Sequence, residues 1–306
     1  MSLEHKKTVS LRLATRGSKL ALAQADEAIK YLAGPHPEVR IEVATIVTAG
    51  DLENKRSLRE LAGDGHFTRA IDQAVLEGRA DFAVHSLKDL PVVPMAGMKI
   101  AAVLPRSSPA DSLVTVKGVS LAAMPSHSVI GSGSLRRGAQ LLRLRPDIRL
   151  APVRGNIDSR LRRLKAGEWD GLILAEAGLR RLGTDCRRVS LAEEFLPAAG
   201  QGAVALTVAR GNRIVGHLLA GVNDAATACT TTAERAFMHG LGAGCHTPVG
   251  VRATIAEDRL LMEGAVWSED GQVEARAVAE FAIDDPLAAG RALAEKVMAA
   301  GGDRLL

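Results

Sequence analysis

Two glycines, two serines and two arginines follow a short apolar run in Val129-Ile-Gly-Ser-Gly-Ser-Leu-Arg-Arg-Gly138. The apolar pair predicts the end of a strand, and the leucine spacing after Ser134 predicts a helix that begins there. The first N–H groups of a helix lack intrahelical partners and lie at the positive end of its dipole, so this turn is suited to an anion. The hydroxyls of Ser132 and Ser134 and the guanidinium groups of Arg136 and Arg137 add donors. The segment therefore predicts a site for a negatively charged ligand.

More arginines follow this turn at short intervals. They are Arg143, Arg145, Arg149, Arg154, Arg160, Arg162 and Arg163. Arg154-Gly-Asn156 opens a predicted helix whose apolar face is Ile157, Leu161 and Leu164. Arg160 lies at the edge of that apolar stripe, where it can point into a cleft. We therefore expect a ligand with several negative charges.

A second strand end with similar chemistry lies near the start of the chain. The alternation of apolar and polar residues after Val9 predicts a strand that runs into Thr15-Arg-Gly-Ser18. Ser18 is then the N-cap of a helix that ends near Gly34. Ligands of parallel sheets gather at the carboxyl ends of strands, so Arg16 and Ser18 are candidate binding residues. The alternative is a surface arginine and an ordinary helix cap.

Adjacent opposite charges follow another predicted strand. Asp81-Phe-Ala-Val-His85 predicts a buried strand that leads into Ser86-Leu-Lys-Asp-Leu-Pro91, where the proline prevents a helix from continuing. At such a position Asp89 can accept hydrogen bonds from a developing cation, with Lys88 adjusting its pKa. The alternative is a solvated turn. We expect His85, at the strand end, to be a core histidine.

Cys245 differs from the other two cysteines in its surroundings. It lies in Gly240-Leu-Gly-Ala-Gly-Cys-His-Thr-Pro-Val-Gly250, where glycines leave the backbone open and His246 favours the thiolate. Cys186 lies beside arginines on a predicted surface loop, and Cys229 lies in a helical pattern. Cys245 is therefore either a reactive thiol or a buried turn thiol. Because the sequence has no CxxC pair and no HxxEH pattern, we expect no metal site.

The composition is typical of a globular protein from a reducing compartment. The 306 residues are 47% hydrophobic and 24% charged, with a net charge of +4, and this length predicts two or three domains. Three cysteines do not make a disulfide framework. The charged start Met-Ser-Leu-Glu-His-Lys-Lys lacks the apolar core of a secretion signal, and no apolar run reaches membrane-spanning length. We expect a cytoplasmic protein without a membrane partner.

The order of the predicted elements indicates an α/β fold with a different C-terminal part. Strands and helices alternate at the start, which predicts a parallel sheet, and a second such run follows Pro105-Arg-Ser-Ser-Pro109. Residues 203–208 predict a strand that returns to the first lobe. Three strands between residues 249 and 279 and a following helix predict a small antiparallel α+β domain. We expect domains at residues 1–104 with 200–221, at residues 105–199 and at residues 222–306.

Six motifs occur in one order along nearly the whole chain. They are Arg16-Gly-Ser-Lys-Leu20, His85-Ser-Leu-Lys-Asp-Leu-Pro91, Gly131-Ser-Gly-Ser-Leu-Arg-Arg137, Arg154-Gly-Asn156, Gly200-Gln-Gly202 and Gly244-Cys-His-Thr-Pro-Val-Gly250. Each motif alone is weak, but the ordered set closely resembles the hydroxymethylbilane synthase family, also called porphobilinogen deaminase.

The resemblance implies a transferase of porphyrin and heme biosynthesis that joins four porphobilinogen molecules head to tail and releases ammonia at each step. Water then frees the linear tetrapyrrole, hydroxymethylbilane. The resemblance also implies a dipyrromethane cofactor, built from two porphobilinogens and held by a thioether on Cys245. It makes Asp89 the catalytic carboxylate. The fold that it implies has two lobes like a bilobal solute-binding protein and a third domain that carries the cysteine.

Each pyrrole carries an acetate and a propionate, so the cofactor and the growing chain present a row of carboxylates that arginine binds well. On this basis we expect cofactor binding by Lys88, Ser132, Ser134, Arg136, Arg137, Arg154 and Arg160. We expect substrate binding by Arg16, Ser18, Arg181 and Gln201. Asp89 is then the anion for the positive charge that spreads over the ring when ammonia leaves.

Residues 48–66 are polar and predict a mobile basic flap or a disordered segment. The sequence departs from the family's usual pattern at the end of this segment and at two other positions. The flap sequence reads Gly63-Asp-Gly-His-Phe-Thr-Arg69, where the family usually has Gly-Lys-Gly-Leu-Phe-x-Lys. His246 replaces a glutamine, and Thr207 stands where a glutamate is common. We expect these changes to affect rate and flap closure rather than the core chemistry.

Two other classes of protein fit part of the sequence. A non-catalytic bilobal protein that binds a polycarboxylate explains the strand-end arginines but gives Cys245 no role. A nucleic-acid binder would explain the arginines, but one Tyr, two Trp and five Phe leave few rings for base stacking. We therefore expect a monomeric enzyme with a small-molecule substrate and no nucleic-acid partner.

Overall fold

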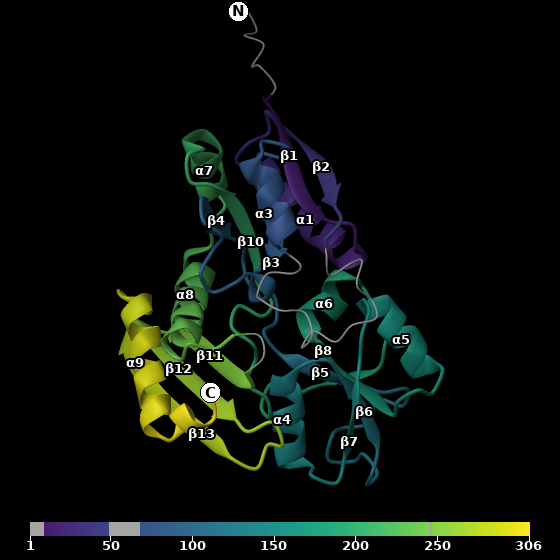
Figure 1. Ribbon diagram of the computed structural model, residues 1–306. Helices are drawn as coiled ribbons and strands as arrows, with labels where there is room; N and C mark the ends of the chain where they lie inside the picture. The colour runs from purple at the N-terminus through teal and green to yellow at the C-terminus, as the bar shows by residue number, and fades with distance from the viewer. Residues whose placement is uncertain (1–8, 49–67, 245–246) are drawn as a thin grey trace, which may run out of the picture. The chain divides into compact units, whose positions relative to one another are not determined.

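The computed structural model describes residues 9–48, 68–244 and 247–306, and the chain forms two compact units (Figure 1). Unit 1 comprises Met1–Arg106 and Ala203–Ala228, and unit 2 comprises Ser107–Gly202 and Cys229–Leu306. Apart from Thr48, the flap expected at residues 48–66 lies outside the described residues, as do Cys245 and His246. The predicted α/β class with a C-terminal antiparallel sheet is confirmed. The division into three domains remains a prediction.

Unit 1 is built on a five-stranded sheet with the strand order β2-β1-β3-β10-β4. The strands are β1 (Val9–Arg16), β2 (Val39–Ile46), β3 (Phe82–Ser86), β4 (Met98–Val103) and β10 (Val204–Ala209). β1 pairs in parallel with β2 and β3, whereas β10 pairs antiparallel with β3 and β4. The parallel sheet expected from the sequence is therefore confirmed for β1, β2 and β3, whereas β10 runs antiparallel to both of its neighbours. Parallel neighbouring strands are usually joined by a crossover helix. The chain reaches β10 from unit 2 instead, so β10 need not be parallel to β3.

The helices of unit 1 pack apolar faces on this sheet. Within the described part of unit 1 they are α1 (Lys19–Ala33), α3 (Arg69–Leu76) and α7 (Arg213–Ala220), and η1 (Leu87–Asp89) is a single 3-10 turn. On α1, Ala25, Ala28 and Leu32 lie on one face because they are three and four residues apart, and they are buried with Leu13 and Leu206. This packing fixes the junction between β1 and α1.

Unit 2 begins with a second five-stranded sheet, in the order β7-β6-β8-β5-β9. The strands are β5 (Asp111–Val114), β6 (Val129–Ser132), β7 (Arg149–Pro152), β8 (Gly171–Ala175) and β9 (Arg188–Ser190). β6 is parallel to β7 and β8, and β5 is antiparallel to β8 and β9. The helices that accompany it are α4 (Leu135–Leu144), α5 (Ile157–Lys165) and α6 (Glu176–Arg181). The carboxyl ends of the parallel strands β6 and β7 thus lead toward the arginine-rich segments of the sequence.

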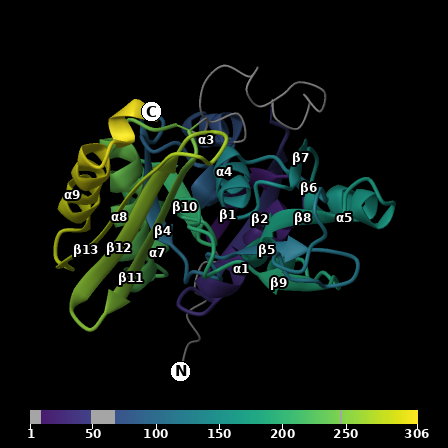
Figure 2. The same cartoon turned by 90° about the horizontal axis from the view of Figure 1, so that it is seen from below.

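The C-terminal part of unit 2 is an antiparallel sheet of β11 (Val249–Ala256), β12 (Arg259–Trp267) and β13 (Glu274–Ala282). Figure 2 shows α8 (Ala225–Gly240) and α9 (Pro286–Ala299) along this sheet, and η2 (Gly302–Arg304) follows α9. Phe237 and Leu293 are fully buried between the helices and the sheet. The two helices approach closely at Gly290, where a Cβ atom would lie 2.2 Å from the carbonyl oxygen of Ala233. α8 therefore brings the chain from unit 1 into this core just before the cysteine loop.

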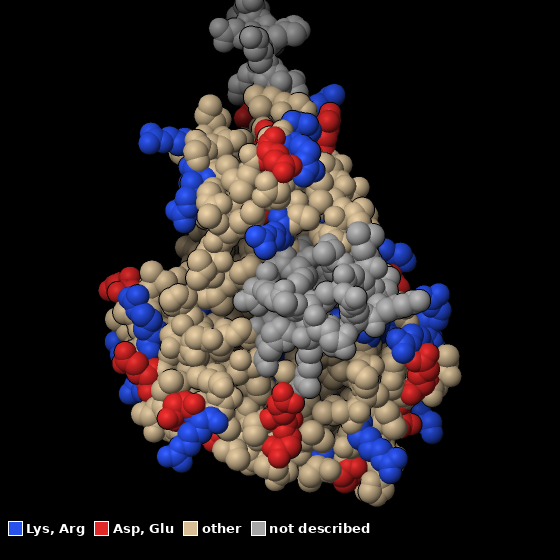
Figure 3. All heavy atoms as spheres, in the orientation of Figure 1, with Lys and Arg blue, Asp and Glu red and all other residues tan. Residues whose placement is uncertain are grey.

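The described surface carries charges of both signs. On the face shown in Figure 3, basic and acidic side chains lie interspersed among the described residues. None of the helices in the described ranges is both long enough and apolar enough to span a bilayer.

Candidate active site

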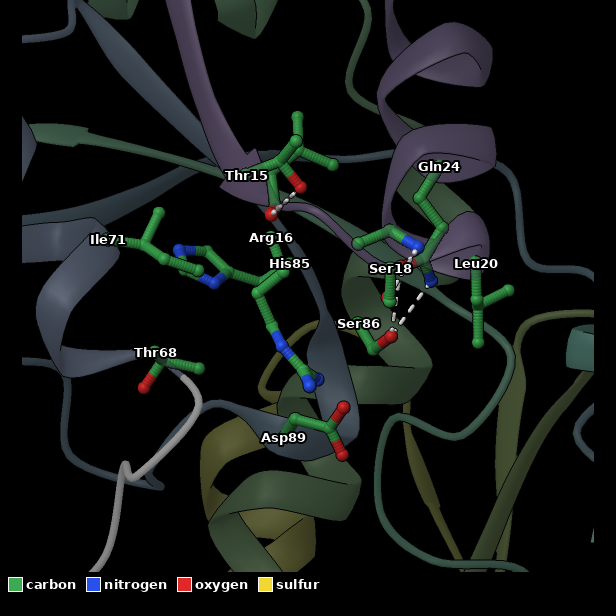
Figure 4. A pocket seen from close by; sticks show the side chains of 12 residues that line it. Thr15, Arg16, Ser18, Leu20, Gln24, Thr68, Ile71, His85, Ser86 and Asp89 are labelled. Atoms are coloured by element: carbon green, nitrogen blue, oxygen red, sulfur yellow. Dashed lines mark hydrogen bonds between the residues drawn. The ribbon is translucent and has the colours of Figure 1, made fainter. Parts of the chain in front are cut away.

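A pocket in unit 1 lies at the carboxyl ends of β1 and β3, between the first turns of α1 and α3 (Figure 4). Its polar lining includes Arg16 from β1, Ser18 at the start of α1, His85 and Ser86 from β3, and Asp89 from η1. Strand ends and helix starts therefore converge here, as the sequence predicted for Arg16 and Ser18.

The turn that carries Asp89 is fixed by its neighbours in the sequence. Leu87 and Leu90 are buried, at 1% and 7% exposure, so Asp89 is held outward between two anchored side chains. The backbone N–H of Leu87 also donates to the carbonyl of Ala203, at 3.0 Å. Pro91 cannot continue a helix, which limits η1 to one turn. Asp89 is thus an exposed carboxylate on a rigid support.

Arg16 is the cationic residue that points toward this carboxylate, as Figure 4 shows. The opposite wall is fixed by Gln24 of α1 and Ser86 of β3, which exchange hydrogen bonds of 2.9 and 3.1 Å. Ser18 caps α1, because its Oγ accepts from the N–H of Ala21 at 3.3 Å. The helix cap that the sequence offered as an alternative for Ser18 is therefore present. A ligand contact of the same hydroxyl remains a prediction.

Behind the pocket, a buried polar group joins three elements of unit 1. Nε2 of His85 lies 3.0 Å from Oδ1 of Asp72 on α3, and Thr207 of β10 donates to the same oxygen at 3.0 Å. All three residues are at most 4% exposed. His85 is a core histidine, as expected, and it also lines the pocket. The sequence did not predict Asp72 as a partner of His85. Residue types alone do not indicate which side chain of a short helix lies opposite which side chain of a short strand.

In unit 2, the turn between β6 and α4 has the geometry that its serines and glycines predict. Ser134 caps α4 by accepting from the N–H of Arg137, and Ser132 Oγ accepts from the N–H of Ser134 at 3.2 Å. A Cβ at Gly131 would lie 2.5 Å from Leu172, and one at Gly133 would lie 2.7 Å from the carbonyl oxygen of Val153. Both glycines are thus required for the close packing of this turn.

Arg136 and Arg137 are buried beside one carboxylate that the sequence analysis missed. Asp111, the first residue of β5, lies 2.8 Å from Nη1 of Arg136 and 2.7 Å from Nη2 of Arg137. Burial alone would raise the pKa of Asp111, but the two arginines hold it well below its ordinary range. The signal in the sequence was only an acidic residue after Pro109, which is common in loops.

Arg154 and Arg160 belong to a concentration of positive charge in unit 2. Burial, and then the charges of Arg137, Arg154 and Arg163, lower the pKa of Arg160 to about 10. Nε of Arg160 donates to the carbonyl of Gly155 at 2.8 Å, which orients its side chain. Cations that disfavour each other's charge in this way form a site that an anion would stabilise.

The remaining predicted residues occupy different positions. Arg181 donates to the carbonyl of Gly202 at 3.0 Å, and the buried Gln201 donates to Pro109 and Asp111 at 2.7 and 2.9 Å. Lys88 is half-buried on η1 beside Asp89. The predicted residues are therefore divided between the units. Arg16, Ser18, Lys88 and Asp89 lie in unit 1, whereas Ser132, Ser134, Arg136, Arg137, Arg154, Arg160, Arg181 and Gln201 lie in unit 2.

Cys245, the predicted attachment point, lies outside the described residues. Among the residues that are described, no three His, Cys, Asp or Glu side chains are grouped to hold a metal ion.

Comparison with known proteins identifies the class to which this site belongs. Residues 11–216 match the family described as "Porphobilinogen deaminase, dipyromethane cofactor binding domain", and residues 228–299 match "Porphobilinogen deaminase, C-terminal domain". The chain belongs to the porphobilinogen deaminase family. This confirms the family, the transferase class and the dipyrromethane cofactor that the motifs predicted.

Individual relatives support the same assignment over nearly full length. The chain is 41% identical to the porphobilinogen deaminase of Roseiflexus sp. (strain RS-1), over 97% of this chain and 98% of that protein. It is 39% identical to that of Thiobacillus denitrificans (strain ATCC 25259 / T1), again over 97% and 98%.

Solved structures give a weaker resemblance. A TRAP periplasmic solute binding protein from Desulfovibrio salexigens is similar with a TM-score of 0.39 and 13% identity, over 71% of this chain and 72% of that chain. At this score the resemblance adds nothing to the fold described above.

The residues of unit 2 fit a cofactor that is rich in carboxylates. Burial and then the charges of Arg137, Arg154 and Arg163 lower the pKa of Arg160, and acetate and propionate groups would offset the repulsion between these guanidinium groups. The capped turn at Ser132 and Ser134 lies at the start of the helix that carries Arg137.

Proposed function

We propose that this chain joins four porphobilinogen molecules head to tail into hydroxymethylbilane, with loss of ammonia at each step. The observation that carries this proposal is the pocket of unit 1, which combines Arg16 and Ser18 with the carboxylate of Asp89. A cation and a hydroxyl suit the acid side chains of a pyrrole, and the exposed carboxylate of Asp89 suits a ring that becomes positive. Few substrates need both.

Asp89 is the catalytic residue of this proposal. When the bond between the aminomethyl carbon and nitrogen of porphobilinogen breaks, ammonia leaves with the electron pair, and positive charge spreads over the ring. A carboxylate ~4 Å away attracts such a charge by about 4 kcal/mol at an effective dielectric constant near 20. Asp89 also accepts hydrogen bonds from pyrrole N–H groups and moves a proton at its carboxylate oxygens. Its fixed turn keeps this anion in place without reorganisation during the reaction.

Arginines and serines hold the carboxylates of the substrate and the growing chain. Arg16, Ser18, Arg181 and Gln201 bind substrate, and Lys88, Ser132, Ser134, Arg136, Arg137, Arg154 and Arg160 bind the cofactor. When bound, dipyrromethane supplies the pyrrole carbon to which the first substrate unit is joined. Cys245 holds the cofactor by a thioether, so that the product stays attached over several rounds.

We further propose that the protein is a cytoplasmic monomer without a nucleic-acid partner. The charges of both signs on the described face in Figure 3 support the absence of a nucleic-acid partner, because nucleic-acid binding requires a continuous basic surface. The three domains expected from the sequence, at residues 1–104 with 200–221, 105–199 and 222–306, are part of the same proposal.

Intact mass and substrate consumption test the proposal together. Purified wild-type protein should carry a covalent adduct and consume porphobilinogen, and Cys245→Ser should run at the polypeptide mass and consume none. Cys186→Ser is the matched control, because Cys186 lies on unit 2 beside Arg188 and has no part in the proposal. Wild-type protein without adduct that still bound porphobilinogen would favour the non-catalytic polycarboxylate-binding protein.

A further inference from the structure

We propose that Asp111 is a positioning residue that sets the guanidinium groups of Arg136 and Arg137 before any ligand carboxylate reaches them. The proposal rests on the carboxylate-binding role given above to these arginines. Nothing in the six sequence motifs includes Asp111, and its role follows from its contacts in the structure.

Each carboxylate oxygen of Asp111 accepts hydrogen bonds from one of the two arginines. Oδ2 accepts from Nη1 of Arg136 at 2.8 Å. Oδ1 accepts from Nε and Nη2 of Arg137 at 2.9 and 2.7 Å, so it receives the side edge of that guanidinium group. Adjacent residues of a helix point in different directions, and one carboxylate therefore has to lie between them to hold both.

Asp111 is itself held in place from another element. Gln201 donates from Nε2 to Oδ1 of Asp111 at 2.9 Å and to the carbonyl of Pro109 at 2.7 Å. Asp111 is 1% exposed and Gln201 is fully buried. The Asp111 carboxylate is therefore fixed in one orientation. The arginines that donate hydrogen bonds to it are held in a matching orientation.

Arg137 keeps donors for a ligand in this arrangement. Its contacts with Asp111 and with the carbonyl of Ile173 use one N–H each of Nε, Nη1 and Nη2, out of five N–H groups in a guanidinium. Arg137 is also the first of the charges that lower the pKa of Arg160. It therefore belongs both to the Asp111 pair and to the arginine group around Arg160. Asp111 fixes the side edge of the guanidinium and leaves one N–H on each of its two terminal nitrogens.

Asp111 also limits the net charge of the site. Two buried guanidinium groups without an anion would repel each other, and burial already lowers the pKa of Arg136 while Asp111 raises it. With Asp111 present, this group of three carries one net positive charge instead of two. The pair is thus ordered without a ligand, and it retains attraction for a ligand carboxylate.

A second ion pair on the same helix gives a matched comparison. Arg145, the C-cap residue of α4, binds Asp147 at 2.8 Å through both Nε and Nη2, but both side chains are partly exposed. The described side-chain partners of Arg145 are Asp147 and the carbonyls of Leu121 and Met124, which differ from those of Arg137. Asp147→Asn therefore removes an equivalent charge without touching the proposed positioning.

The test compares cofactor uptake with binding of a simple anion. Cofactor-free full-length protein, produced in cells that make no porphobilinogen, is incubated with porphobilinogen, and the gain of mass is followed. We expect Asp111→Asn to slow this gain about 100-fold because the guanidinium is displaced. We expect the same variant to bind inorganic phosphate at least about twofold more tightly, because one buried negative charge is gone. Asp147→Asn should change neither quantity.

Slower mass gain together with tighter phosphate binding in Asp111→Asn supports a positioning role, because a loss of folded protein would weaken both. Unchanged mass gain in Asp111→Asn, or a parallel fall of mass gain and phosphate binding, overturns the proposal. If wild-type protein gained no mass, the proposed function would fail instead, so the two failures are distinct.

A measurement on the wild type covers the case in which Asp111→Asn does not fold. In cofactor-free protein with ¹⁵N-labelled arginine, the Nε–H signal of Arg137, assigned with Arg137→Lys, should exchange with solvent far more slowly than that of the exposed Arg162. Equal exchange rates would mean that Asp111 does not order Arg137 before the ligand arrives, and would overturn the proposal.

Discussion

The two candidate binding regions of this protein place their charges in opposite ways. In unit 1, one carboxylate, Asp89, is exposed on a short turn and faces Arg16 (Figure 4). In unit 2, two arginines, Arg136 and Arg137, contact one carboxylate, Asp111, which is almost completely buried.

The difference follows from what each region has to do. A carboxylate that meets a transient positive charge must remain reachable, and its support has to come from the backbone around it. Guanidinium groups that hold permanent carboxylates gain from being ordered in advance, and a buried counter-ion does this. Substitution of the exposed carboxylate of unit 1 should therefore change turnover at constant stability, whereas substitution of the arginines of unit 2 should change stability and binding together.

The largest expected effect is that of Asp89→Glu. One added methylene moves the carboxylate by about 1 Å, and we expect turnover to fall about 100-fold or more. Asp89 is exposed, so the melting temperature and the cofactor adduct should be unchanged. Steady-state kinetics, thermal unfolding and intact mass measure these three quantities. Glu77→Asp, at the exposed end of α3, is the control. Wild-type turnover in Asp89→Glu would contradict its catalytic role.

A smaller effect with two opposite components is expected for Arg160→Gln. The pKa of Arg160 in the folded protein, about 10, lies below its ordinary value. Its charge therefore lowers the free energy of unfolding at neutral pH, and this penalty fades as the pH rises above about 10. We expect Arg160→Gln to stabilise cofactor-free protein by about 1–2 kcal/mol at pH 7, and by less at higher pH.

The same substitution should weaken phosphate binding about tenfold, because a charge-assisted hydrogen bond is lost. Calorimetry and chemical denaturation measure the two components. Arg162→Gln is the matched control, since Arg162 is exposed on the same helix. If Arg160→Gln destabilised the cofactor-free protein, the idea that these arginines repel each other would be wrong.

The smallest effect on function is expected for Thr207→Val behind the pocket of unit 1. It removes one hydrogen bond to the buried Asp72 and should lower the free energy of unfolding by about 1–3 kcal/mol. Thr207→Ser keeps the donor and should lose less. Because Thr207 does not line the pocket, turnover should fall far less than in Asp89→Glu. A loss as large as that of Asp89→Glu would place the Asp72–His85 pair in the chemistry.

The sequence predicted the strand ends and helix starts well because their signals are local. Ser18 and Ser134 are N-caps, and Gly131 and Gly133 allow close packing, as their residue types indicate. Two strands were not predicted, β4 and the three-residue β9. In β4, Lys99 interrupts the apolar residues, and a strand as short as β9 gives no period to detect.

The partners of the predicted residues could not be read from the sequence in the same way. Asp111 lies 25 residues before Arg136 and Thr207 lies 135 residues after Asp72, so only the folded chain brings each pair together. Acidic and hydroxyl residues are common in loops and strands, and their types alone do not single out a partner. The sequence therefore shows which groups carry the chemistry, whereas the structure shows which groups hold them.

The position of β10 has a consequence for the order in which the protein is made. This strand lies between β3 and β4, and its first neighbour, Ala203, anchors the turn that carries Asp89. During synthesis the ribosome must complete residues 107–202 before β10 is made. Until then, the edges of β3 and β4 that pair with β10 in the folded sheet have no partner strand. The nascent N-terminal segment therefore cannot complete its sheet, or secure the Asp89 turn, until about two-thirds of the polypeptide has emerged.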